Sequence, residues 1–398
     1  MKAMTIGISP EYNYPGAYDK WRQDNTYFAS NFGGSLITRA IMREFDADYV
    51  DDFSDMAALK NRYDTCIMAF ATHAHATRSV QRYADIVEKL QMKVIVVSLG
   101  LSDYVQPGEE NYPLHTSVCR ILDIAAESST WIGVRGPYTA SVLHRNGYKD
   151  VLPIGCPTIY WNLGRDFPIA DKVGPVHKPL VVYHKTLAVD PAALLQGMPL
   201  LGQDFQDQAI FTDDLGEDTR LLEMERKFYD TLEDGKSALA AVRDRGIFPA
   251  GFDDWFNTIG GHDFVFGPRL HGCIAALIQG VPAVLAYRDL RTREMIEVFN
   301  FPSVTYDTLA SHTLTSLASS VNFARFRKTY AERYDNYCAF ISENGLDSRL
   351  IPASKHSYRY LTADQCTFNF LAQSSRQPLR EQARSRRSKL RRLIHRLR

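Results

Sequence analysis

Largely apolar runs alternate with segments of helical periodicity along the first 155 residues. Five of these runs predict strands: 4–9, 64–71, 93–100, 129–136 and 151–155. Between them, apolar residues recur at intervals of three and four, which predicts helices. The predicted helices span 33–45, 78–91, 115–127 and 137–146. Apolar strands separated by helices are typical of a parallel sheet that is covered on both faces.

The same alternation resumes after a stretch rich in Gly, Pro and charge, 162–179, which is predicted to be a linker. Later strands are predicted at 180–186, 263–267 and 282–287, and later helices at 252–259, 272–280 and 313–344. The pattern predicts an α/β fold with two Rossmann-like domains facing a cleft, where open sheets place ligands. The predicted parts are 1–170, 171–312, a helical segment at 313–375 and a tail at 376–398.

Composition and cysteine usage indicate a cytoplasmic globular protein. Its 398 residues are 45% hydrophobic and 23% charged, as in soluble proteins. The N-terminus has no apolar stretch of signal-peptide length, and no run approaches the roughly 20 apolar residues that a membrane span needs. The six Cys are scattered without a C-x-x-C pair, which predicts buried reduced thiols rather than disulfides or a zinc site.

The net charge of zero conceals a basic tail. Residues 376–398 carry nine Arg, one Lys and one Glu, or +9, and the rest of the chain, with 36 basic and 45 acidic residues, is −9. The apolar residues of the tail recur at helical spacing: Leu390, Leu393, Ile394 and Leu397. This pattern predicts a basic amphipathic helix on an anionic membrane surface, and so a peripheral location at the inner face of the membrane.

Two alternatives for the tail stay open. It is either a disordered solubilising segment or a helix that docks on the acidic stretch 203–234, itself predicted to be a solvated insertion or surface helix. No aromatic platform or folded module accompanies the charge, so nucleic acid is not expected as a partner.

Arg269 and His271 stand where the apolar strand 263–267 gives way to a small-residue helix. The pattern predicts both side chains in a βα loop at the carboxyl edge of the sheet, beside the free N–H groups of the helix. A helix N-terminus and a guanidinium together bind anions, and Gly272 would let an anion approach the backbone closely. The alternative is a salt-bridged Arg269 and a His271 that caps the turn.

Further polar residues end other predicted strands. Arg135 would face the cleft from the first half as a second anion ligand, or else form a capping salt bridge. His184 and Lys185 end the first strand of the second half. His73 and His75 form an H-x-H pair that is expected to line an acceptor pocket. Two ligands are too few for a firm metal site, and a structural role for the pair is the alternative.

Two segments carry a resemblance to a known family. The first reads G-P-R-L-H-G at 267–272, followed by a small-residue helix and R-T-R-E at 291–294. The second, 133–160, contains V-R and G-C-P in the corresponding order and separation. Both resemble the polysaccharide pyruvyl transferase family, over roughly residues 30–310 of this chain. The stretch at 30–34 only loosely matches the N-terminal G-N-x-G-D loop of that family.

The resemblance implies a two-domain fold of the GT-B type and an enzyme of bacterial exopolysaccharide or capsule synthesis. Its donor would be phosphoenolpyruvate, and its product a cyclic pyruvate ketal on two hydroxyls of a sugar, either in a lipid-linked unit or in a growing chain. No metal, nucleotide or flavin is implied. The implied catalytic residues are His271 and Arg269. The residues implied for donor binding are Arg135, Lys185, Arg269, Leu270, His271 and Gly272. The residues assigned to the acceptor are Asp24, Asn31, His73 and His75.

Two other classes of protein stay open. A glycosyltransferase of GT-B fold would also need an Arg and a helix N-terminus for the diphosphate of a nucleotide sugar. A non-catalytic glycan-binding protein would keep the fold without the reaction. The cationic residues present in both motifs favour the pyruvyl transferase. Its general acid is either His271, whose pKa neighbouring Arg residues should lower, or a carboxylic acid, for which Asp24 is the candidate.

Overall fold

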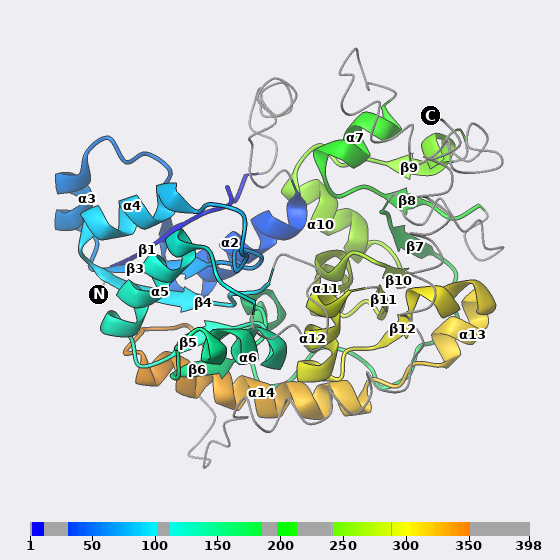
Figure 1. Ribbon diagram of the computed structural model, residues 1–398. Helices are drawn as coiled ribbons and strands as arrows, with labels where there is room; N and C mark the ends of the chain where they lie inside the picture. Colours follow the sequence, from blue (N-terminus) through cyan, green and yellow to red (C-terminus); the bar gives the residue numbers. More distant parts are fainter. Residues whose placement is uncertain are drawn as a thin grey trace, which may run out of the picture.

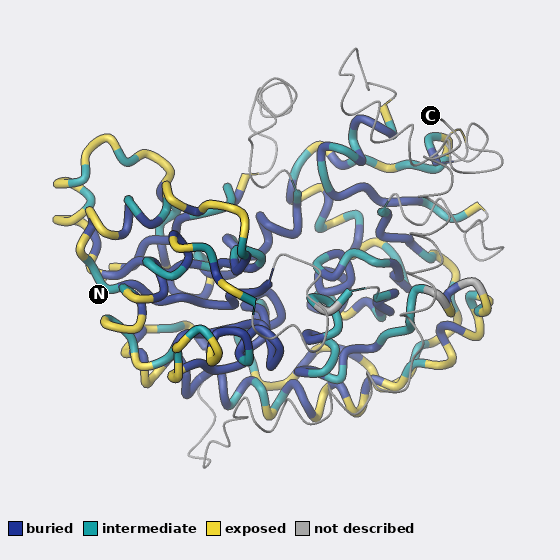
Figure 2. Tube along the Cα trace, in the orientation of Figure 1, coloured by how far each residue is buried: buried dark blue, intermediate teal, exposed yellow. Residues whose placement is uncertain are grey.

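Two parallel sheets, each covered by helices, form the protein (Figure 1). The computed structural model describes residues 2–11, 31–101, 112–184, 197–212, 240, 242–287 and 289–350. The α/β class with two Rossmann-like units, predicted from the sequence, is confirmed. Figure 2 shows that the strands of both units are largely buried, whereas the exposed residues lie mostly on the outer helices and loops.

The N-terminal sheet has the strand order β2-β1-β3-β4, and all neighbours are parallel. Its strands are β1 (Ala3–Ile6), β2 (Asp48–Tyr49), β3 (Thr65–Ala69) and β4 (Lys93–Val97). A further parallel pair consists of β5 (Ile132–Val134) and β6 (Val151–Pro153). A parallel bridge between Leu99 and Val134 joins this pair to the end of β4. The helices of this unit are α2 (Phe32–Phe45), α3 (Met56–Arg62), α4 (Gln81–Leu90), α5 (Thr116–Ser128) and α6 (Pro137–Arg145).

The C-terminal sheet has the order β12-β11-β10-β7-β8-β9 and is also parallel throughout. Its strands are β7 (Pro179–Val182), β8 (Leu200–Leu201), β9 (Gly246–Ile247), β10 (Phe264–Gly267), β11 (Ala283–Tyr287) and β12 (Ser303–Thr305). Its helices are α7 (Phe205–Phe211), α10 (Phe252–Gly260), α11 (Leu270–Ile278) and α12 (Leu290–Phe299). Read from β9, this is the 3-2-1-4-5-6 order of the Rossmann fold.

Two short 3-10 helices and two α-helices complete the fold: η1 (Pro157–Tyr160), η4 (Tyr306–Ser311), α13 (Leu314–Ser319) and α14 (Ala324–Glu343). The long helix α14 runs beneath both units (Figure 1). Its Tyr337 ring stacks on Tyr160 with centroids 4.2 Å apart, and Arg165 pairs with Asp335 at 2.9 Å. Trp131, just before β5, donates its backbone N–H to the Asn344 side chain at 2.9 Å. The chain therefore returns to the N-terminal unit after completing the C-terminal sheet.

Most of the predicted elements are confirmed, including the helices expected within 313–344. The sequence pattern did not predict the short strands β2, β8, β9 and β12, nor helices α3 and α12, and it gave no bounds for α7 within 203–234. Strands of two or three residues are too short to show a period. The predicted burial of the thiols is confirmed for Cys66, Cys156, Cys273 and Cys338, whereas Cys119 is half-buried, and none of these five forms a disulfide with a described residue; Cys366 lies outside the described residues. Within the described ranges, no helix combines the length and apolarity needed to cross a membrane.

The acidic segment 203–234 is only partly as predicted. At its start Gln203, Phe205 and Asp207 are buried, so the expectation of a solvated surface is wrong there. The reason is that α7 packs against the C-terminal sheet and turns its acidic residues toward a partly buried cation, Arg269. Residues 213–234 lie outside the described residues.

A buried carboxyl group links α2 to the chain after α14. Glu44 is 1% exposed, and its carboxyl accepts hydrogen bonds from the Tyr337 hydroxyl at 2.9 Å and from Ser348 Oγ at 3.3 Å. Burial raises the pKa of Glu44 from 4.5 to about 8, although both hydrogen bonds act to lower it. The folded protein therefore favours the protonated form of Glu44.

We expect the stability that depends on Glu44 to fall with rising pH. Since the pKa is raised in the folded state, this stability is complete below about pH 4.5 and is lost as pH rises through about 8. Glu44→Gln, which cannot ionise, should match the wild type at pH 5 and exceed it by on the order of 3 kcal/mol at pH 9. Urea unfolding at both pH values measures this. A constant difference between the two proteins would contradict it.

Candidate functional site

The carboxyl ends of strands from the two sheets come together at the junction of the units. His271 of α11 packs on Gly33 of α2 so closely that a Cβ on Gly33 would lie 2.7 Å from the His271 Cβ. At the same junction, Glu294 of α12 accepts a hydrogen bond from the Thr139 hydroxyl of α6 at 2.9 Å. Burial and the charge of Arg135 both lower the pKa of His271. Arg135 and His271, the two predicted anion ligands, therefore lie close enough to interact electrostatically.

Arg135 is a buried cation that is poorly matched by the protein itself. The residue follows β5 and is 4% exposed, and its Nε and Nη2 atoms have no hydrogen-bond partner among the described residues. Gly100 makes room for its side chain, because a Cβ on Gly100 would lie 2.8 Å from Arg135 Cδ and 2.4 Å from the Ala71 carbonyl oxygen. Burying a charged group without a partner costs several kcal/mol. This arrangement therefore indicates a site that receives an anion.

Two further enclosed polar atoms follow the neighbouring strands. Ser98, just after β4, has a φ of 60°, and its buried Oγ has no partner within the described part of the chain. His73, after β3, has an equally unpartnered Nδ1, and its ring lies 4.8 Å from that of Phe70. Left-handed backbone at a non-glycine residue is uncommon and gathers at functional sites. Since β3, β4 and β5 are neighbours, His73, Ser98 and Arg135 line one edge of the N-terminal sheet.

His73 is electrically neutral in this setting. Burial lowers its pKa to about 4, and the charges of His75 and Arg135 act in the same direction. Its imidazole can therefore accept a hydrogen bond from a hydroxyl group at neutral pH. That property suits the acceptor role predicted for His73.

Arg269 is paired with two carboxylates. Its Nη2 donates to Asp204 Oδ2 at 2.6 Å and to Asp207 Oδ2 at 3.0 Å, and its Nε donates to the Tyr183 carbonyl oxygen at 3.0 Å. The side chain is 17% exposed, and Nη1 forms no hydrogen bond with a described residue. The salt-bridged alternative is therefore observed, and at most part of the guanidinium is left for an incoming anion.

The two carboxylates beside Arg269 differ in their titration. Burial acts to raise the pKa of Asp204, but the charge of Arg269 and the hydrogen bonds from Arg269 and the Asp207 backbone together outweigh burial, and the pKa lies below its ordinary value. Burial and the negative charge of Asp204 raise the pKa of Asp207 to about 7. Asp207 also accepts the backbone N–H of Gln203 at 2.9 Å. The cluster thus ties β7, α7 and the start of α11 together.

The sequence predicted His271 on a loop, but the residue lies in a helix. Helix α11 begins at Leu270, with Arg269 as its N-cap residue, so His271 is in the first helical turn. Its Nε2 is 3.6 Å from the Sγ atom of Cys156, the central residue of the G-C-P motif. Burial and the charge of Arg135 lower the pKa of His271 to about 3, so the imidazole is neutral near pH 7.

Leu270 and Gly272 have packing roles that the sequence did not reveal. Leu270 is 7% exposed and belongs to the main core. A Cβ on Gly272 would lie 2.5 Å from Val182 Cγ1, so the glycine lets α11 approach β7. The expectation that Gly272 lets an anion approach the backbone closely stays a prediction. Arg269 makes no side-chain cap, which leaves the first N–H groups of α11 without a side-chain acceptor from that residue.

The predicted acceptor residues are only partly brought to this edge. Asn31 is the N-cap of α2, and its Oδ1 accepts the Gly34 N–H at 2.9 Å, so its side chain has a structural task. His75 is 3% exposed, and its Nδ1 accepts the Arg78 N–H at 2.9 Å, which matches the structural alternative. Asp24 and Lys185 lie outside the described residues.

The sequence reasoning missed Glu294 as a residue of the junction. Glu294 is 1% exposed, and its carboxylate accepts the Thr139 N–H at 3.1 Å as well as the Thr139 hydroxyl. It thereby caps α6, whose N-cap Gly136 has no side chain to do so. Burial raises the pKa of Glu294 to about 7, while the hydrogen bonds from Thr139 and the charge of Arg135 act to lower it. Only its place in the R-T-R-E motif signalled this residue.

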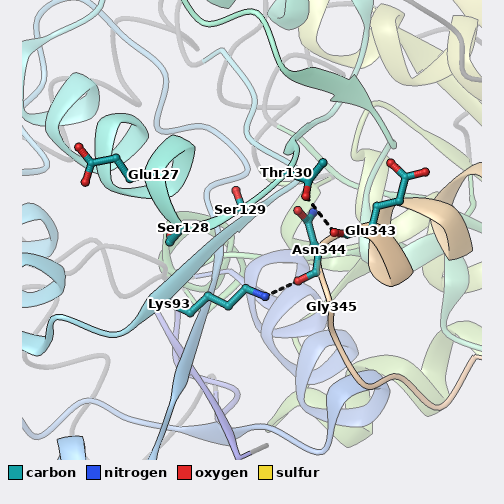
Figure 3. A pocket seen from close by; sticks show the side chains of 8 residues that line it. All are labelled: Lys93, Glu127, Ser128, Ser129, Thr130, Glu343, Asn344 and Gly345. Carbon is teal, nitrogen blue, oxygen red and sulfur yellow. Dashed lines mark hydrogen bonds between the residues drawn. The ribbon is translucent and has the colours of Figure 1, made fainter.

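A surface pocket lies at the opposite edge of the N-terminal sheet (Figure 3). It lies where the start of β4 and the end of α5 meet the end of α14. Lys93 donates to the Asn344 carbonyl oxygen, and Thr130 Oγ1 donates to the Glu343 carbonyl oxygen at 2.9 Å. Because its polar groups bond to each other, the pocket is a seam that holds α14. Nor do three His, Cys, Asp or Glu residues cluster as metal ligands anywhere in the described part of the chain.

Fold and site together define a two-unit α/β protein with a buried guanidinium, incompletely hydrogen-bonded among the described residues, at the carboxyl edge of its N-terminal sheet. The model of the family "Polysaccharide pyruvyl transferase" matches residues 18–289, and the chain belongs to this family. No curated protein matches the chain significantly.

Solved structures with similar folds are distant in sequence. S. aureus MnaA in complex with UDP is 11% identical, with a TM-score of 0.43, over 89% of this chain and 100% of its own. The UDP-GlcNAc 2-epimerase of Methanocaldococcus jannaschii is 12% identical, with a TM-score of 0.36, over 94% of this chain and 99% of its own. Anabaena HepE, with UDP and glucose, is 12% identical, with a TM-score of 0.39, over 85% of this chain and 99% of its own.

Proposed function

We propose that this protein transfers pyruvate from phosphoenolpyruvate to two hydroxyls of a sugar in a bacterial exopolysaccharide or capsule precursor. Membership of the pyruvyl transferase family supports the reaction class. The observation that carries the proposal is Arg135, a buried guanidinium with two unpartnered nitrogens at the carboxyl edge of the sheet. Phosphoenolpyruvate carries a carboxylate and a phosphate, and either group is a suitable bidentate partner for Arg.

The reaction balances without a cofactor. A proton adds to C3 of phosphoenolpyruvate while the oxygen of one sugar hydroxyl bonds to C2. The oxygen of the second hydroxyl then displaces inorganic phosphate from C2 and closes the ketal. One hydroxyl proton balances the proton gained by C3, and the other leaves with phosphate.

We assign roles to the residues as follows. Arg135 binds one anionic group of the donor, and His271 donates a hydrogen bond to an oxygen of the donor. Arg269 holds the start of α11 through Tyr183 and Asp204 and offers Nη1 to the donor. Neutral His73 accepts a hydrogen bond from a hydroxyl of the acceptor. Lys185 keeps its proposed place in the donor site, and Asp24 in the acceptor site.

The test is incubation of the full chain with phosphoenolpyruvate and a panel of galactosides, glucosides and mannosides, free and lipid-linked. Mass spectrometry should find a pyruvate ketal on one acceptor class, with one phosphate released per ketal. Thermal stabilisation by a nucleotide sugar, with no ketal formed, would instead indicate a glycosyltransferase. Glycan binding with no turnover of any donor would indicate a non-catalytic protein.

The tail belongs to the same proposal, although residues 376–398 lie outside the described residues. Each cation near an anionic surface contributes about 1 kcal/mol, so the tail should hold the acidic body at the membrane where lipid-linked acceptors reside. We expect the full chain to sediment with anionic vesicles at low salt. A chain that ends at Ser375 should stay in the supernatant. Equal sedimentation of the full and the shortened chain would contradict membrane binding by the tail.

A further inference from the structure

A chain of three polar groups leads from the N-terminal unit to His271. Thr158, in η1, donates its hydroxyl to the Cys156 Sγ atom at 3.1 Å, and this sulfur lies 3.6 Å from His271 Nε2. Thr158 and Cys156 are both 0% exposed, so water does not compete for these groups. The second nitrogen of the ring, Nδ1, forms no hydrogen bond with a described residue.

The direction of this chain follows from the chemistry of its members. Since the sulfur already accepts the Thr158 hydrogen, the thiol hydrogen of Cys156 is free to be donated. The acceptor within reach is His271 Nε2. An imidazole that accepts at Nε2 carries its hydrogen on Nδ1.

We infer that Cys156 is a positioning residue that holds His271 in the Nδ1–H tautomer, so that this N–H donates to an oxygen of the anionic donor. The inference rests on the proposed function only for the identity of the donor. The tautomer itself is a property of the free protein. Because the pKa of His271 is lowered to about 3, the ring should remain in this single neutral form across the physiological pH range.

Nitrogen-15 NMR of the full chain labelled at the His imidazoles tests the tautomer directly. The His271 signal is identified by its loss in His271→Asn. In the wild type it should show a protonated Nδ1 and an unprotonated Nε2, unchanged between pH 5.5 and 8. Cys156→Ser should retain this form, whereas Cys156→Ala should shift it toward the Nε2–H tautomer. A wild-type ring protonated on Nε2 would overturn the inference.

Kinetics with phosphoenolpyruvate and the acceptor then test the consequence. Cys156→Ala should raise the KM for phosphoenolpyruvate about tenfold with little change in the KM for the acceptor, and Cys156→Ser should restore it. Cys66→Ala is the matched control, because it also removes a buried thiol, from β3, and should leave both KM values unchanged. An unchanged donor KM in Cys156→Ala would overturn the inference. If the wild type forms no ketal, the proposed function fails while the NMR result still stands.

Discussion

Replacing Arg135 by Met should make the protein more stable and inactive at the same time. The folded protein encloses a guanidinium whose Nε and Nη2 have no partner among the described residues, and an apolar side chain of similar length removes that cost. We expect the free energy of unfolding to rise by about 1–3 kcal/mol in urea. We expect donor affinity to fall at least about 100-fold, because a buried charge partner of the donor is lost.

Thermal unfolding with and without phosphoenolpyruvate measures donor binding by the wild type and the variants. The wild type should gain stability with the ligand, by mass action, and Arg135→Met should gain none. Arg135→Lys keeps the charge but not the fork of two donors, so it should also bind poorly. Arg62→Met is the matched control, because Arg62 pairs with Asp48 on the surface and should change stability by less than about 1 kcal/mol. A destabilised Arg135→Met that still binds the donor would show that Arg135 is structural.

Arg269→Met should have the opposite effect on stability. It leaves Asp204 and Asp207 facing each other without the cation that both contact. Breaking a buried ion pair from one side costs about 3–5 kcal/mol, so we expect a loss of that size in urea unfolding. The loss should be larger at pH 8 than at pH 5.5, since protonation of Asp207, whose pKa is raised to about 7, relieves the repulsion.

Asp207→Asn in the Arg269→Met background provides the control. It removes one of the two negative charges and should recover part of the lost stability. No recovery would show that the loss comes from packing around Arg269 rather than from the carboxylates. The ratio of activity to folded protein then reports whether Arg269 also binds the donor through Nη1.

The sequence determined the architecture because both sheets are buried on both faces. Apolar runs such as 93–100 and 263–267 predict buried strands even when the neighbouring strands are not known. Periodic segments such as 33–45 predict which face of a helix is buried. The predicted strands also show where each strand ends, and therefore predict the carboxyl edge of the sheets at which Arg135, His73 and His271 lie. The two motifs supplied the family. Two-residue strands such as β8 carry no such signal and were missed.

What each polar residue does at that edge was decided by the tertiary structure alone. Arg269 and Arg135 look alike in sequence, each ending an apolar strand, yet Arg269 forms ion pairs with two carboxylates and Arg135 forms none with a described residue. The partners lie far along the chain: 65 residues separate Arg269 from Asp204, 115 separate Cys156 from His271, and 155 separate Thr139 from Glu294. A local pattern reports burial and periodicity within one element, whereas the charge and hydrogen bonds of a buried group depend on which other elements pack against it.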